Sequence, residues 1–129
     1  MTRLLVAVAL AAALTPAVSA EGQQCTASGI RVEEAFAERV CKVAPNYGMH
    51  PEEVHSIGAG GVDVFIPEAE GRTLQANRTA LTRAVRSLTE WVKANYTDFN
   101  FVEVTIVSGD ERIARGSKLG TNETKVTIN

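Results

Sequence analysis

The chain has 129 residues, of which 45% are apolar, 13 are basic and 15 are acidic. This length and this nearly balanced charge exclude a multidomain protein and a wholly basic nucleic-acid-binding protein. No segment has the ~20 consecutive apolar residues of a membrane-spanning helix, which excludes an integral membrane protein.

Residues 1–20 have the pattern of a secretory signal peptide. Arg3 precedes an apolar run from Leu4 to Leu14, and small residues follow up to Ala20, the expected cleavage edge. The run has 11 residues, which is too short to cross a bilayer. We therefore expect residues 21–129 to form a single exported domain, periplasmic or extracellular, with 12 basic and 15 acidic residues.

Cys25 and Cys41 are the only cysteines, and they lie 16 positions apart. In an oxidising compartment two lone cysteines most often pair, and closing a loop of this length stabilises a fold by roughly 3 kcal/mol in the chain-entropy model. The alternative is a redox-active pair, but the spacing is not the C-x-x-C of thiol oxidoreductases. The sequence therefore predicts a structural disulfide.

The first half of the domain predicts one helix and two short strands. A helix is expected over residues 30–44, capped by Thr26 or Ser28, because apolar residues recur on one face there. Strands are expected at residues 54–57 and 62–66, on either side of the glycine-rich turn at residues 58–61. Residues 68–72 are expected to form a polar loop.

The strongest periodic pattern predicts a long helix over residues 73–96. Leu81, Val85 and Leu88 belong to an apolar arc of about 120° on this helix. The basic residues occupy a separate arc of about 140°, which is the expected outer face: Arg72, Arg78, Arg83, Arg86 and Lys93.

Three more strands are expected at residues 101–107, 112–118 and 124–128, the first two joined by a hairpin turn at residues 108–111. The segment 101–107 is apolar on both faces, which places it inside the sheet. The fold class is therefore α+β, with an antiparallel sheet of about four to five strands packed on one long amphipathic helix. The shorter, disulfide-tethered first helix would close an edge or the second face.

The small net charge hides an uneven distribution, because residues 21–71 are net −6 and residues 72–93 are net +4. The basic helix face, with Arg78, Arg83, Arg86 and Lys93 as candidate binding residues, could dock an acidic protein, an anionic glycan or lipid headgroups. Its polar side carries no aromatic residue, which argues against nucleic acid. The alternative is a solvated helix face without a partner.

Met49, His50 and His55 form a second candidate site, because methionine and histidine ligands suit copper and histidine suits zinc. The two histidines are five positions apart with Pro51 between them, whereas a helical zinc pair prefers a spacing of four. The alternative is a solvated turn beside a strand, and we expect no cofactor.

No residue pattern converges on a catalytic set. His55 and Ser56 are adjacent, but neighbours on a strand point to opposite faces, so they do not form a nucleophile and base pair. Adjacent acidic residues, such as Glu52 and Glu53, diverge instead of sharing a substrate. The turn at residues 58–61 is not followed directly by a helix, unlike a phosphate-binding loop. We therefore expect a non-enzymatic protein.

Three Asn-x-Thr sequons begin at Asn77, Asn95 and Asn122. The composition of the chain gives roughly one by chance, and Asn77 falls inside the expected long helix. The sequence leaves open a bacterial or a eukaryotic origin, the use of these sequons and the oligomeric state.

The leading functional hypothesis is an exported binding or accessory protein that contacts another macromolecule or envelope component through the basic helix face. A second is a small secreted protease inhibitor. Gly60–Gly61, a strand, a long helix, and then strands with the hairpin sequence Val107–Gly109 resemble the element order of the cystatins. A third is a periplasmic metal-binding protein that uses Met49, His50 and His55.

Overall fold

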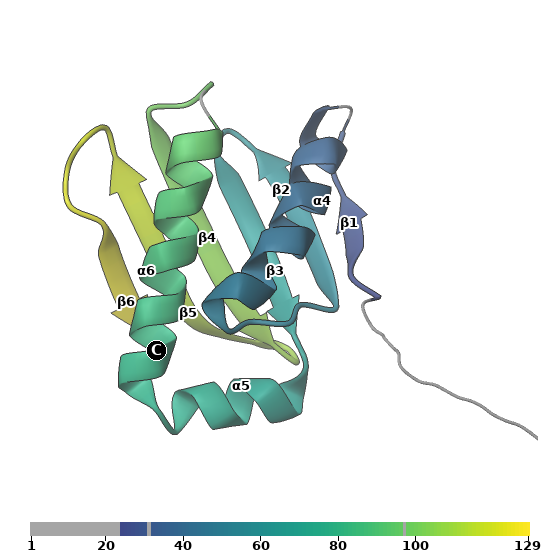
Figure 1. Ribbon diagram of the computed structural model, residues 1–129, viewed down its shortest axis with the longest axis vertical. Coiled ribbons are helices and arrows are strands. Elements are labelled where there is room, and N and C mark those ends of the chain that lie inside the picture. Colours follow the sequence, from purple (N-terminus) through teal and green to yellow (C-terminus); the bar gives the residue numbers. More distant parts are fainter. Residues whose placement is uncertain (1–23, 31, 97) are drawn as a thin grey trace, which may run out of the picture.

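The computed structural model describes residues 24–30, 32–96 and 98–129, so the expected signal peptide at residues 1–20 lies outside the described residues. The strands are β1 (Thr26–Ser28), β2 (Glu53–Gly58), β3 (Gly61–Ile66), β4 (Phe101–Ser108), β5 (Glu111–Leu119) and β6 (Lys125–Ile128) (Figure 1). The helices are α4 (Val32–Val43), α5 (Glu68–Gln75) and α6 (Arg78–Asn95), with a short 3₁₀ helix, η1 (Ala44–Tyr47), directly after α4.

The six strands form one mixed sheet in the order β1-β2-β3-β4-β5-β6. β1 pairs with β2 and β3 pairs with β4 in parallel, whereas the other three neighbouring pairs are antiparallel. The α+β class is confirmed, and so is the interior position of β4 between β3 and β5. The antiparallel sheet of about four to five strands expected from the sequence agrees only roughly with this sheet, which has six strands and two parallel pairings.

The difference has two physical causes. β1 has only three residues, too few to show an alternating pattern, so the expected helix cap at Thr26 or Ser28 is instead a strand. A helix between two strands carries the chain back along the sheet, so the next strand runs in the same direction as the last. α4 makes this connection between β1 and β2, and α5 with α6 makes it between β3 and β4.

The expected long helix at residues 73–96 is two helices, and the expected loop at residues 68–72 belongs to the first of them. α5 begins directly after Pro67 and ends at Gln75. Asn77 then caps α6, because its side-chain oxygen accepts a hydrogen bond from the Ala80 N–H at 3.1 Å. Satisfying a free N–H in this way starts a new helix instead of continuing the old one.

α4 and α6 lie on one face of the sheet, and α5 runs across one end of it (Figure 1). α4 contacts β1 and β2, whereas α6 contacts β4, β5 and β6. The first helix therefore covers the β1–β2 edge, one of the two places expected for it, and not the second face. In the described part of the chain no helix covers that second face, which we call the open face.

A single apolar core fills the space between the helices and the sheet. Leu81, Leu88 and Val92 of α6 are fully buried, as the helical period predicts. Burying an aliphatic side chain of this size contributes about 1.5–3 kcal/mol. Gly116 of β5 lets α6 approach the sheet closely, because a Cβ at this position would lie 2.1 Å from Thr89 Oγ1.

Candidate functional site

The basic face of α6 surrounds a shallow hollow of about 370 Å³. The hollow is bordered by the side chains of Arg78, Arg83 and Arg86, and its lining also includes Thr79 and Thr82. The helix turns these residues outward because its apolar stripe is held in the core. The structure therefore brings three of the four predicted basic residues together around one depression.

Lys93, the fourth predicted residue, does not line this hollow. It lies seven residues after Arg86, about two helical turns further on, and its side chain is half-buried. None of the ion pairs formed by the described residues involves Arg78, Arg83 or Arg86. The three guanidinium groups thus remain available to an anionic group from outside the chain.

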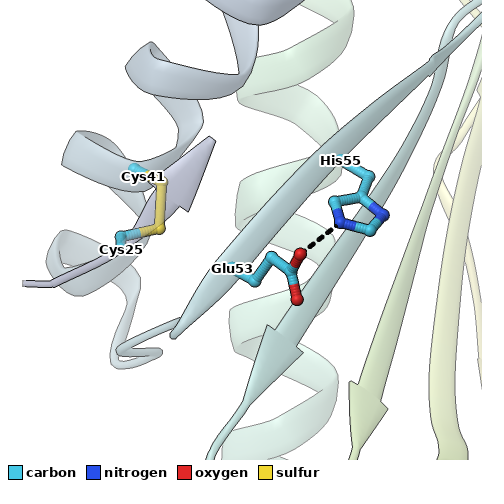
Figure 2. Close-up of a disulfide and its surroundings, with 4 residues drawn as sticks. All are labelled: Cys25, Cys41, Glu53 and His55. Atoms are coloured by element: carbon cyan, nitrogen blue, oxygen red, sulfur yellow. Dashed lines mark hydrogen bonds and ion pairs between the residues drawn. A yellow bond between two sulfur atoms is a disulfide. The ribbon is translucent and has the colours of Figure 1, made fainter. Parts of the chain in front are cut away.

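A larger hollow, about 830 Å³, lies at the edge of the sheet beside the disulfide. Cys25 and Cys41 form the expected bond, with Cα atoms 5.8 Å apart, and join the segment before β1 to α4 (Figure 2). The hollow is lined by both half-cystines, three prolines and mixed charges: Gln24, Cys25, Ala27, Glu38, Cys41, Lys42, Pro45, His50, Pro51, Glu52 and Pro67. Acidic and basic groups both reach it, so it has no clear charge preference.

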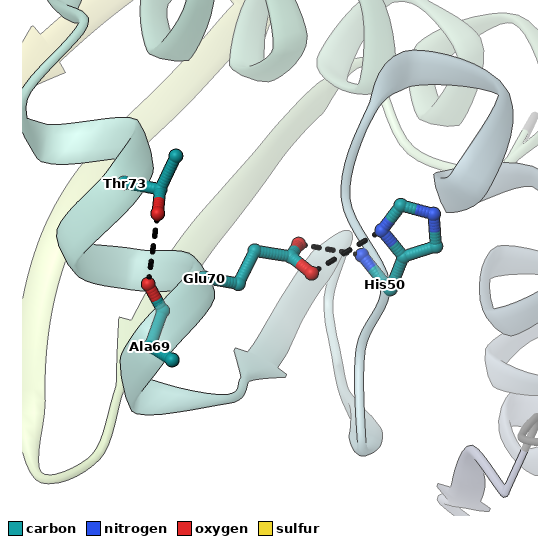
Figure 3. A network of polar contacts seen from close by, with 4 residues as sticks. All are labelled: His50, Ala69, Glu70 and Thr73. Atoms are coloured by element: carbon teal, nitrogen blue, oxygen red, sulfur yellow. Dashed lines mark hydrogen bonds and ion pairs between the residues drawn. The ribbon is translucent and has the colours of Figure 1, made fainter.

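The predicted metal ligands have separate surroundings. Met49 is fully buried in the apolar core. His50 contacts Glu70 of α5 twice, through its backbone N–H at 2.7 Å and through Nδ1 at 3.2 Å (Figure 3). His55 Nε2 lies 2.6 Å from Glu53 Oε2 on the open face of β2 (Figure 2). Among the described residues no group of three histidine, cysteine, aspartate or glutamate side chains could hold a metal ion.

A polar cluster of buried Ser56, buried Tyr96 and half-buried Glu33 was not predicted from the sequence. Ser56 Oγ donates a hydrogen bond to Glu33 Oε1 at 2.6 Å, and the Tyr96 hydroxyl donates to the same oxygen. Burial, and then the hydrogen bond to the Glu33 carboxylate, raise the pKa of Tyr96 to about 12. Tyr96 therefore stays protonated at neutral pH and donates to Glu33, whose carboxylate joins α4 to β2 and to the end of α6.

Two of the three sequon asparagines already serve the fold. Asn77 is the cap of α6 described above. The Asn95 side chain donates to the Trp91 carbonyl at 2.8 Å and accepts from Arg39 Nη2 at 2.9 Å. Asn122 lies exposed in the turn between β5 and β6. Only Asn122 combines an exposed side chain with a turn, as a glycosylation acceptor requires.

The two segments that carry the cystatin resemblance lie at opposite ends of the sheet. Gly60–Gly61 precedes and begins β3, whereas Val107–Gly109 ends β4 and begins the turn to β5. β3 and β4 are parallel, so the start of one and the end of the other are a strand length apart. These two segments therefore do not form one continuous surface.

No helix in the described ranges has the length and apolar character needed to cross a bilayer. Comparison of the chain with protein-family models, with curated proteins and with solved structures finds no match. The arrangement of its own residues is therefore the basis for assigning a function.

Proposed function

We propose that this chain is an exported, non-enzymatic binding protein that docks on an acidic surface of another protein through the basic face of α6. The observation that carries the proposal is the hollow bordered by Arg78, Arg83 and Arg86. Guanidinium groups form paired hydrogen bonds with carboxylates, and such charge-assisted bonds are about twice as strong as neutral ones. Three of them around one depression suit a partner that presents several carboxylates.

The burial of the other side of α6 favours a protein over a lipid surface. An amphipathic helix binds a membrane by inserting its apolar face among the acyl chains. In this chain Leu81, Leu88 and Val92, which form that face, are fully buried against the sheet. Only charged and hydroxyl side chains of the hollow remain for contact, and these suit a polar protein surface.

A further observation supports the export part of the proposal. The Cys25–Cys41 disulfide is a bond that persists mainly in oxidising compartments.

The test compares binding of a fluorescent oligoglutamate peptide by the wild type and by the triple variant Arg78→Gln, Arg83→Gln, Arg86→Gln. We expect saturable binding that weakens at least tenfold in the variant and with added salt, because each lost guanidinium removes a charge-assisted hydrogen bond. A matched control, Lys42→Gln, Arg72→Gln, Lys118→Gln, removes three positive charges outside the hollow and should retain binding. Equal loss in both triple variants would mean that net charge alone attracts the peptide, which would refute a site on α6.

Phosphatidylglycerol vesicles and heparin are the probes for the competing anionic partners. Binding to either of them, with no binding of oligoglutamate, would contradict the proposal of a protein partner. A photo-crosslinking residue placed at Thr82, inside the hollow, then identifies the physiological partner in the native compartment. The identified partner should present an acidic patch, and its capture should be lost in the Arg78, Arg83, Arg86 variant.

A further inference from the structure

The open face of the sheet carries a row of exposed apolar side chains at one end. Ile57 is 62% exposed, Phe101 is 44% exposed and Leu119 is 49% exposed. Phe101 pairs directly with Leu119, and Ile57 lies near the end of β2 at the same end of the sheet. These are three of the four exposed large hydrophobic residues in the described part of the chain, so they are concentrated here.

The charges on the open face are divided between its two halves. Strand register and alternation place the acidic side chains Glu53, Asp63 and Glu103 on β2, β3 and β4. The same register places the basic side chains Arg112, Arg115 and Lys125 on β5 and β6. The face is therefore neutral as a whole but has an acidic half and a basic half.

Asp63, Thr105 and Arg115 lie in one row across the centre of this face, on β3, β4 and β5. A hollow of about 260 Å³ lies between the two halves, and Asp63 and Arg115 both line it. Arg115 Nε is 3.5 Å from Glu103 Oε2, an exposed pair of the kind that contributes little to stability. Both charges of the row can therefore contact a second molecule.

We propose that the open face packs on the open face of a second copy of this chain, about a two-fold axis that runs along the strands near β4. This rotation exchanges β3 with β5 and β2 with β6, so Asp63 of each copy faces Arg115 of the other. It also places the apolar end of one copy on the apolar end of its mate. A two-fold axis across the strands would instead oppose the acidic strands to each other, so charge selects the first axis.

The division of charge favours a second copy over a partner of one sign. A wholly acidic or wholly basic partner would be attracted by one half of the face and repelled by the other. Six strands of about six residues, spaced about 4.8 Å apart, make a face of roughly 500 Å² in projection. This is less than the ~800 Å² per partner of a standard interface and falls in the size range of weak complexes. Two such faces therefore suit a weak dimer, with sheets packed about 10 Å apart.

Sedimentation velocity of the exported, disulfide-bonded chain from about 5 to about 500 μM tests the proposal. We expect a monomer–dimer equilibrium in the wild type. Asp63→Arg and Arg115→Asp should each raise the dimer dissociation constant at least tenfold, because each opposes like charges across the interface. An equimolar mixture of the two variants should form dimers again, because the introduced arginine of one copy then faces the introduced aspartate of the other.

Restoration in the mixture separates lost association from lost folding, because misfolded variants would not complement one another. Glu34→Arg, a change of the same sign and size as Asp63→Arg on the helical side of the molecule, is the control and should dimerise as the wild type does. A wild type that stays monomeric throughout this range would overturn the proposal. A dimer that withstands both single variants would overturn it as well, because it would use another surface.

Discussion

The two faces of the sheet are built from the same strands but have different chemistry. On the covered face Val62, Val104 and Ile106 are fully buried beneath the helices. On the open face the neighbouring positions of the same strands carry Asp63 and Thr105, which are only half-buried. The covered face therefore supplies most of the buried apolar surface of the fold, whereas the open face presents charged and polar side chains outward.

Truncating a leucine on each face gives the largest difference between them. Leu88→Ala removes a fully buried side chain and should lower the free energy of unfolding by about 2–5 kcal/mol, since a cavity remains in the core. Leu119→Ala removes a 49% exposed side chain and should lower it by less than about 1 kcal/mol. Urea unfolding at low protein concentration measures both values. Equal losses would mean that the open face also contributes a core to the monomer.

Removing the disulfide tests how much this bond stabilises the β1 edge of the sheet. Replacing both Cys25 and Cys41 by serine should lower the free energy of unfolding by about 3 kcal/mol, because the unfolded chain regains loop entropy. Amide hydrogen exchange should accelerate most in β1, a strand of three residues. Wild type treated with a reducing agent is the control and should behave like the double variant. Unchanged exchange in β1 would show that packing against α4 alone holds this edge.

The covered face could be predicted from the sequence, because burial imposes a period. The helical period placed Leu81, Leu88 and Val92 inward on α6, and all three are buried. The turn at Gly109–Asp110 between β4 and β5 was equally visible, because glycine accepts the φ of 61° found there. The pairing of Cys25 with Cys41 followed from their being the only two cysteines.

The pairings between distant segments could not be predicted in the same way. The two parallel pairings depend on β1, whose three residues carry no pattern, and on the path of the helices between strands. The segment 101–107 is apolar on both faces, which predicted an interior strand, yet Phe101 of β4 is 44% exposed. Ser56 was the one residue whose position indicated the polar cluster, because it is polar and lies on the inward face of β2, the same face as Val54.

The basic hollow on α6 was more accessible to prediction than the polar cluster. Arg78, Thr82 and Arg86 are four residues apart, so the helical repeat alone places them on one face. Glu33 and Tyr96 are 63 residues apart and meet only through the packing of α4 against the sheet. Local spacing therefore predicts a site on one helix but not a contact between helices.

The smallest expected effect concerns Tyr96, the polar group that closes one end of the covered face. Tyr96→Phe removes the hydrogen bond to Glu33 and should lower the free energy of unfolding by about 1–2 kcal/mol at pH 8. Tyr47→Phe is the matched control, because no hydrogen bond of the described residues involves the Tyr47 hydroxyl, and it should cost less than about 0.5 kcal/mol.

The stability difference between the wild type and Tyr96→Phe should depend on pH, and the raised pKa of Tyr96 gives the direction of this dependence. The pKa of Tyr96 is about 12 in the folded chain, above the ordinary value of 10.0, so the folded state keeps this proton after the unfolded state has lost it. The stabilisation is therefore complete below pH ~10 and declines by up to about 1.4 kcal/mol per pH unit as the pH rises toward 12. Urea unfolding of both proteins from pH 8 to 11 should show the deficit of Tyr96→Phe shrinking above pH ~10. A deficit that stays constant with pH would mean that Tyr96 is not held by burial and by Glu33, and that the polar cluster does not close this end of the core.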